Sequence, residues 1–195
     1  MGNLAYQDKD YEVLDGKIFY MSPRPIINHN RVIGNIYTIF SVFLKGKKCE
    51  PFYDGVDVYL TDKDTVIPDF MVVCNKDIIK NNGIYGVPNL IVEVLSPSTA
   101  KNDRGYKKDL YERVGVSEYW IVDTLNHSVE IYLLQDGKYI LSDMYSLYPD
   151  YVIEKMTEEE KAEMKTEFTT SLYGDNLIIK LEDVFYNVFS NPIEK

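Results

Sequence analysis

The 195-residue sequence has no run of about 18 apolar residues, so no segment of it predicts a helix that spans a membrane. Its first residues, MGNLAYQDKDYE, lack the apolar core of an export signal. Gly2 does not complete a myristoylation motif, because position 6 is Tyr rather than Ser or Thr. We therefore expect a cytoplasmic protein.

Cysteine is scarce, with only Cys49 and Cys74 in the chain. The two residues lie far apart in the sequence and form no CxxC motif, which argues against a zinc site. Since cytoplasmic thiols are kept reduced, we expect both to be free thiols in a core rather than a disulfide.

Positive charge is also in short supply: 21 Lys and Arg stand against 31 Asp and Glu, a net charge of −10. Such a balance disfavours non-specific binding to nucleic acid, which needs cations at the phosphates. Cations nevertheless gather in two stretches, at Lys45, Lys47 and Lys48 and at Lys101, Arg104, Lys107, Lys108 and Arg113. Lys101, Arg104 and Lys108 are therefore candidates for contact with nucleic acid, and a solvated helix face is the alternative.

Seventeen tyrosines and many alternating apolar runs indicate strands interspersed with helices. The predicted order is a hairpin at 11–21 across Asp15-Gly16, a helix at 26–44, strands at 56–60 and 66–73, a loop at 75–89, a strand at 90–95, a helix at 99–114, a strand at 118–123, a hairpin at 129–144, a charged helix from Thr157, and a short strand and helix within 177–189. This order predicts one α/β domain around a mixed sheet.

The strands at 90–95 and 118–123 are joined by a helix, so we expect them to be parallel. The acidic stretch at about 154–170 has few apolar anchors. It is interpreted as a solvated insertion or as an arm that contacts a partner.

Two carboxylates interrupt strands that are otherwise apolar. Glu93 lies within LIVEVL on the face of Ile91 and Leu95, and Asp69 follows Pro68 in VIPDFMVV. A buried carboxylate without a cation is unfavourable by several kcal/mol. Pro68 places the second strand at an edge or bends it there. Asp69 capping a turn is the simpler alternative for that residue.

A third irregularity lies on the helix at 99–114. Asp103, Lys107, Leu110, Tyr111 and Val114 form one stripe at about 3.6 residues per turn. The stripe that packs on the sheet thus continues as charged residues toward the helix start. Two carboxylates and an ammonium are therefore expected to converge at the carboxyl end of the Glu93 strand.

Carboxylates with a nearby lysine suit phosphodiester hydrolysis, because carboxylates bind Mg²⁺ and a lysine orients a water or a phosphate. The simpler alternatives are a buried ion pair between Glu93 and Lys107, and a dipole-stabilised Asp103 at a helix start.

The residues above also carry a family resemblance. The runs IPDFMVV (67–73), PNLIVEVLSPST (88–99), DRGYK (103–107) and GVSEYWIVD (115–123) closely resemble the Uma-two family of PD-(D/E)XK endonucleases. The likeness extends from the first hairpin to the terminal LEDVF, and it implies a restriction-endonuclease-like fold. The acidic insertion at 154–168 is not part of it.

The resemblance implies roles for individual residues. Asp69 and Glu93 would bind Mg²⁺ or Mn²⁺, with Glu12 and the carbonyl of Val94 as further ligands. Leu95 occupies the position of the usual motif lysine, so Lys107 is the implied catalytic lysine. Further candidate site residues are His29 and Asp103.

Three hypotheses follow. The first is a metal-dependent endonuclease that hydrolyses DNA without an organic cofactor. The second is a non-catalytic module on the same fold that binds nucleic acid or protein. The third is an oligomeric role through the Tyr-rich hairpin at 129–148, and the resemblance favours a homodimer.

Overall fold

A computed structural model describes residues 11–21, 26–97 and 99–189 of the chain. The first ten residues, on which the expectation about an export signal rests, lie outside this part. No helix in the described part is long and apolar enough to cross a membrane. The cytoplasmic location stays a prediction.

The larger sheet has the strand order β12-β11-β10-β9-β6-β3. Its strands are β3 (Glu50–Tyr53), β6 (Phe70–Val73), β9 (Leu90–Val94), β10 (Glu118–Asp123), β11 (Ser128–Gln135) and β12 (Lys138–Ser146). Strand β9 is buried at every position, and it pairs parallel with β10 and antiparallel with β6. The predicted parallel pair is confirmed.

A second sheet has the order β2-β1-β5-β4-β8-β7. Its strands are short: β1 (Tyr11–Leu14), β2 (Lys17–Tyr20), β4 (Val58–Thr61), β5 (Asp64–Val66), β7 (Ile79–Lys80) and β8 (Gly83–Tyr85), with the 3-10 turn η1 (Lys76–Ile78) before β7. The hairpin of β1 and β2 turns at Asp15-Gly16, where both residues have positive φ, as predicted.

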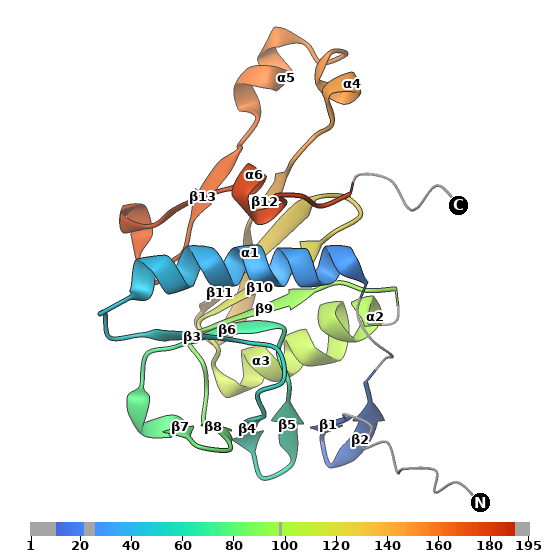
Figure 1. Cartoon of the computed structure of the whole chain (residues 1–195). Coiled ribbons are helices and arrows are strands. Elements are labelled where there is room, and N and C mark those ends of the chain that lie inside the picture. The colour runs from blue at the N-terminus through green and yellow to red at the C-terminus, as the bar shows by residue number, and fades with distance from the viewer. Residues whose placement is uncertain (1–10, 22–25, 98, 190–195) are drawn as a thin grey trace, which may run out of the picture.

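The helices cover both faces of the larger sheet. Helix α1 (Ile27–Leu44) crosses one face, and α3 (Lys108–Val114) lies on the other with the second sheet beyond it (Figure 1). The core beneath α1 contains Phe40, Phe70 and Trp120. The core around α3 contains Leu110 and Tyr111 together with residues of the second sheet, such as Leu14.

The helix predicted at 99–114 is confirmed, but its middle is not regular. A π-helical turn, η2 (Asp103–Lys107), separates α2 (Ala100–Asn102) from α3. Gly115 ends the helix in the left-handed conformation with φ of 91°. The predicted stripe is the buried one, since Asp103, Lys107, Leu110 and Tyr111 are all buried.

The single strand predicted at 66–73 is wrong. The chain forms β5 in the second sheet, breaks at Ile67–Asp69, and continues as β6 in the larger sheet. Pro68 has no N–H for a ladder, so the strand ends where the chain changes sheets. This crossing places Asp69 directly before β6 and within hydrogen-bond distance of the carboxyl end of β9.

The acidic segment projects away from the sheets (Figure 1). It contains α4 (Asp150–Ile153) and α5 (Glu158–Glu163), and α5 begins with a capping box between Thr157 and Glu160. No residue from 148 to 167 is buried. Within the predicted range of 154–170, Phe168 and Thr170 are buried. The role of this segment, including contact with a partner, stays a prediction.

The C-terminal part returns to the core. Strands β13 (Glu167–Thr169) and β14 (Ile178–Lys180) form a small sheet, with the 3-10 turn η3 (Gly174–Asn176) between them and α6 (Leu181–Val184) after them. Their buried side chains join the core beneath α1: Phe168, Leu177, Ile179, Leu181, Val184 and Phe185. The strand and helix predicted within 177–189 are confirmed.

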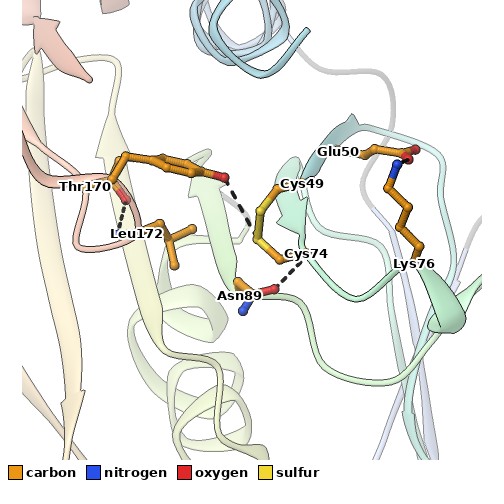
Figure 2. Close-up of a disulfide and its surroundings, with 8 residues drawn as sticks. Cys49, Glu50, Cys74, Lys76, Asn89, Thr170 and Leu172 are labelled. Atoms are coloured by element: carbon orange, nitrogen blue, oxygen red, sulfur yellow. Dashed lines mark hydrogen bonds and ion pairs between the residues drawn. A yellow bond between two sulfur atoms is a disulfide. The ribbon is translucent and has the colours of Figure 1, made fainter. Parts of the chain in front are cut away.

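The prediction that Cys49 and Cys74 are free thiols is wrong, because they form a disulfide (Figure 2). Strands β3 and β6 are antiparallel with Glu50 opposite Val73. The next opposed positions along this register are Cys49 and Cys74, whose Cα atoms lie 4.0 Å apart. Long-range strand pairing, which cysteine spacing does not reveal, therefore brings them together.

Candidate active site

Three acidic side chains surround the Lys107 ammonium. Its Nζ lies 2.8 Å from Glu12 Oε1, 3.1 Å from Glu93 Oε1 and 3.9 Å from Asp103 Oδ1. Glu12 comes from β1 in the second sheet, Glu93 from β9 in the larger sheet, and Asp103 and Lys107 from the π-helical turn between them. The cluster thus joins the two sheets at the helix that separates them.

Glu93 is almost fully buried, and one of its two oxygens has two hydrogen-bond donors. Its Oε1 accepts hydrogen bonds from Lys107 Nζ and, at 2.7 Å, from the Tyr111 hydroxyl. Burial raises the pKa of Glu93 well above its usual value; Lys107 opposes the shift, whereas Asp69, Asp103 and Glu12 add to it. Burial and the Glu93 charge also raise the pKa of Tyr111, which keeps its hydroxyl a donor.

Lys107 and Asp103 of the cluster have shifted pKa values as well. Burial disfavours the Lys107 ammonium, but Glu93, Glu12 and Asp103 outweigh it and raise the Lys107 pKa above its usual value. Burial raises the pKa of Asp103 to about 6 against the attraction of Lys107. Asp103 Oδ1 is buried and has no hydrogen-bond partner. The cluster therefore sets three buried carboxyl groups beside one ammonium, and burial favours the protonated forms of Glu93 and Asp103.

Asp69 lies beside the carboxyl end of the central strand β9. Its Oδ2 accepts a 2.7 Å hydrogen bond from the backbone N–H of Val94, the last residue of β9. Its Oδ1 lies 3.3 Å from His29 Nε2, on the first turn of α1. Burial lowers and the Asp69 contacts raise the pKa of His29, with a net upward shift. Asp69 therefore links α1 to the carboxyl end of β9.

Glu12 serves two neighbours through one oxygen. The Oε1 that contacts Lys107 also accepts a 3.0 Å hydrogen bond from the backbone N–H of Ile67. Ile67 stands in the break between β5 and β6, two residues before Asp69. The first hairpin is thereby fastened to the segment that positions Asp69.

The comparison with family models decides the family. A profile described as "Putative restriction endonuclease", Uma2, matches residues 3–162. The chain belongs to the Uma2 family. The resemblance inferred from the sequence motifs is confirmed.

Two curated relatives of this chain come from Synechocystis sp.. "Uncharacterized protein slr1290" is 30% identical over 132 residues, which cover 67% of this chain and 69% of the relative. "Uncharacterized protein sll1609" is 27% identical over 122 residues, which cover 60% of this chain and 69% of the relative.

A solved structure shares the fold of this Uma2 chain. It is that of a "putative nuclease belonging to DUF820" from Anabaena variabilis, with a TM-score of 0.66 and 17% identity. The match covers 90% of this chain and 89% of the other. The predicted mixed α/β, nuclease-like fold is confirmed.

The structure brings the predicted acidic and basic site residues together in two adjoining sets. Glu12, Glu93 and Asp103 surround Lys107, while Asp69 contacts His29 and the N–H of Val94. Sequence reasoning treated Tyr111 only as a packing residue, because an aromatic residue in an apolar stripe gives no sign of a buried acceptor.

The residues predicted to contact nucleic acid lie on the outer side of the same helix. Arg104 pairs with Glu130 at 2.6 Å, and the Lys108 ammonium lies 3.9 Å from the centre of the Tyr132 ring. Lys101 is exposed on α2. The two contacts hold Arg104 and Lys108 against β11, and their role with nucleic acid stays a prediction.

The donor set suits a hard divalent cation, since it consists of carboxyl groups, whose oxygens such a cation prefers as ligands. Asp103 Oδ1, buried without a hydrogen bond, is a free acceptor within this set. As the side chains of the described residues stand, no three acidic, His or Cys groups are arranged to hold an ion. In this structure the Lys107 ammonium is the positive charge beside the Glu12, Glu93 and Asp103 carboxyl groups.

Proposed function

We propose that this Uma2 protein is a divalent-cation-dependent endonuclease that hydrolyses DNA phosphodiester bonds. The observation that carries the proposal is the meeting of Glu93 and Lys107 beside Asp69 at the carboxyl end of β9. Burial of these charges costs several kcal/mol, which a purely structural role does not require. The family description and the nuclease-like fold support it.

Asp69 and Glu93 would hold the ion, with the carbonyl of Val94 and the Glu12 carboxylate as further ligands. A bound Mg²⁺ or Mn²⁺ would supply a water of lowered pKa and charge neutralisation at the phosphate. The four groups derive from β1, the segment before β6, and β9.

The chain's own side chains have separate tasks in this proposal. Lys107 stays protonated because its pKa is raised, so it offers a fixed positive charge to a phosphate oxygen or to a water. His29 holds one oxygen of Asp69 and the Val94 N–H holds the other, which fixes the plane of that carboxylate. The Tyr111 hydroxyl orients Glu93 in the same way.

The test is cleavage of supercoiled plasmid with Mg²⁺ or Mn²⁺. Wild type is expected to cut, and Asp69→Asn and Glu93→Gln are expected to lose at least about 100-fold in rate. Asp143→Asn, which removes a carboxylate on β12 outside the site, serves as the matched control. Equal activity of wild type and Asp69→Asn would falsify the catalytic proposal.

One observation favours a second function. The Lys107 ammonium already provides the positive charge between the Glu12 and Glu93 carboxyl groups that a metal ion would otherwise provide. The same fold would then bind nucleic acid without cutting it. Two results would support this function: nucleic-acid binding that EDTA does not change, and a calorimetric titration with Mn²⁺ that shows no heat of binding. A Mn²⁺ site that disappears in Glu93→Gln contradicts it.

Pairing as a homodimer stays a separate prediction, which sedimentation velocity tests.

A further inference from the structure

Two exposed aromatic rings lie next to the charged cluster. Phe19 on β2 and Tyr106 in the π-helical turn each expose 37% of their surface. Their ring centres lie 6.3 Å apart at an interplanar angle of 34°, so neither ring covers the face of the other. By contrast, Tyr59 and Tyr85 in the same sheet stack on each other, with centres 4.5 Å apart and an angle of 21°.

The register places these rings beside the proposed site. Phe19 is the direct partner of Glu12 in the β1–β2 pair, and directly opposed side chains project from the same face of a sheet. Glu12 reaches from that face to Lys107, and Tyr106 is the residue before Lys107. A nucleic-acid strand bound at the charged cluster would therefore pass both aromatic rings.

Cations accompany the aromatic pair. Lys17 lies on the same face of the hairpin as Phe19, two positions earlier and exposed. The Arg113 side chain is 59% exposed, although it contacts Asp64 at 3.3 Å. Aromatic rings interleaved with cations are the surface that unpaired nucleic acid uses, since bases stack and phosphates pair.

The balance of charge favours the same substrate. A duplex is held mainly through many phosphate contacts, whereas this chain carries a net charge of −10 and its Arg104 is already paired with Glu130. Stacking on a ring needs no net positive charge. The rings can therefore supply binding that the sparse cations do not.

We propose that Phe19 and Tyr106 form a base-stacking surface through which this site takes nucleic acid with unpaired bases, such as single strands or frayed ends. The inference rests on the proposed function and names its substrate class. The competing occupant is a second copy of the chain, because β2 is an edge strand of its sheet in the described part of the molecule.

Fluorescence anisotropy tests the proposal. A labelled 16-nucleotide single strand and the matching duplex are titrated with the full-length protein in EDTA at low salt. Wild type is expected to bind the single strand more tightly. Phe19→Ala and Tyr106→Ala are each expected to weaken that binding about tenfold. Tyr151→Ala, which removes a ring that is 65% exposed on α4, is expected to change nothing.

Two conservative variants separate stacking from packing. Phe19→Leu keeps apolar bulk but loses the ring, so it should bind as weakly as Phe19→Ala. Tyr106→Phe keeps the ring and should bind as wild type does. Thermal melts of all variants establish that each one folds.

Tighter binding to the duplex, or unchanged single-strand binding in Phe19→Ala and Tyr106→Ala, overturns the proposal. So does sedimentation in which Phe19→Ala converts a dimer into a monomer. Cleavage decides the proposed function separately. Ring-dependent binding without metal-dependent cutting keeps the stacking surface and removes the endonuclease. Metal-dependent cleavage by variants that bind single strands as wild type does keeps the endonuclease and removes the stacking surface.

Discussion

At the scale of single residues, Lys107 holds the centre of the molecule together electrostatically. Its side chain is 7% exposed and lies between Glu12 and Glu93, whose side chains are 9% and 3% exposed. Removing one member of a buried charge group leaves the others without compensation. The cost therefore exceeds that of losing an ordinary ion pair.

Lys107→Met is expected to lower the free energy of unfolding by about 3–5 kcal/mol at pH 7 in EDTA. Urea titration followed by circular dichroism measures it. Lys108→Met, which removes a partly exposed cation from the adjacent position, should cost less than about 1 kcal/mol. Adding Glu93→Gln to Lys107→Met should recover part of the loss. Equal stability of the two single lysine variants would contradict the assignment.

Asp103 makes stability depend on pH. Its pKa of about 6 lies above the ordinary 3.8, so the folded state holds the proton more tightly than the unfolded state. The resulting contribution to the free energy of unfolding is present below pH 4 and is lost as pH rises through 6. Over that window the loss is about 3 kcal/mol at most. Asp103→Asn cannot ionise, so the drop in unfolding free energy between pH 4 and pH 7.5 should be smaller than in wild type. An identical drop in both proteins would refute this reading.

The sequence revealed some of these residues and hid others for physical reasons. Glu93 and Asp69 stand out because a charge inside an apolar run is unfavourable, and Lys107 follows from helical periodicity. Glu12 lies in a two-stranded hairpin where a polar residue is ordinary, and His29 lies at a helix start. Only the family resemblance singled them out, since their partners are distant in the sequence.

At the scale of elements, local periodicity predicted the long helices and the central strands, but pairing between distant strands escaped it. Strand β3 was missed because it has four residues and contains Pro51. Pro68 predicted an edge strand or a bend, whereas the chain changes sheets there. The disulfide depends on the β3–β6 register, so cysteine spacing gave the opposite expectation.

The disulfide closes a loop with a sequence separation of 25 residues. The double variant Cys49→Ser/Cys74→Ser should lose about 3 kcal/mol of unfolding free energy through the freedom gained by its unfolded chain. Denaturation with and without reductant measures this. Reduction should destabilise wild type and leave the double variant unchanged. Thiol alkylation and mass spectrometry that find two free thiols in the unreduced protein would contradict the pairing.

At the scale of the whole molecule, the family match and the folded core have different limits. The profile ends at residue 162, yet six buried residues after it complete the core beneath α1. Glu118, fully buried on β10, accepts hydrogen bonds from the Thr170 hydroxyl and the Ser171 backbone N–H. The order of the main helices and the central strands was predictable, but this anchoring was not, because it joins positions some 50 residues apart.

Ending the chain after Ala162 is therefore expected to expose the α1 core and to abolish cooperative unfolding. Replacing residues 151–164 with a short Gly/Ser linker should leave the melting temperature within a few degrees, because none of them is buried. The Tyr145 and Phe168 rings, 5.0 Å apart, keep the flanking strands close enough for the linker. Calorimetry and dye binding distinguish the truncated variant from the linker variant. A cooperative melt of the variant that ends at Ala162 would refute the expectation.

The double use of Glu12 Oε1 has a consequence for how such a protein evolves. The atom that accepts the Ile67 amide also neutralises the Lys107 ammonium. A change that released the ammonium for reaction would also loosen the first hairpin, and a change that tightened the hairpin would bury the ammonium further. If the chain is the endonuclease proposed above, its activity and its stability therefore depend on the same oxygen atom, and improving either one calls for compensation elsewhere in the sequence.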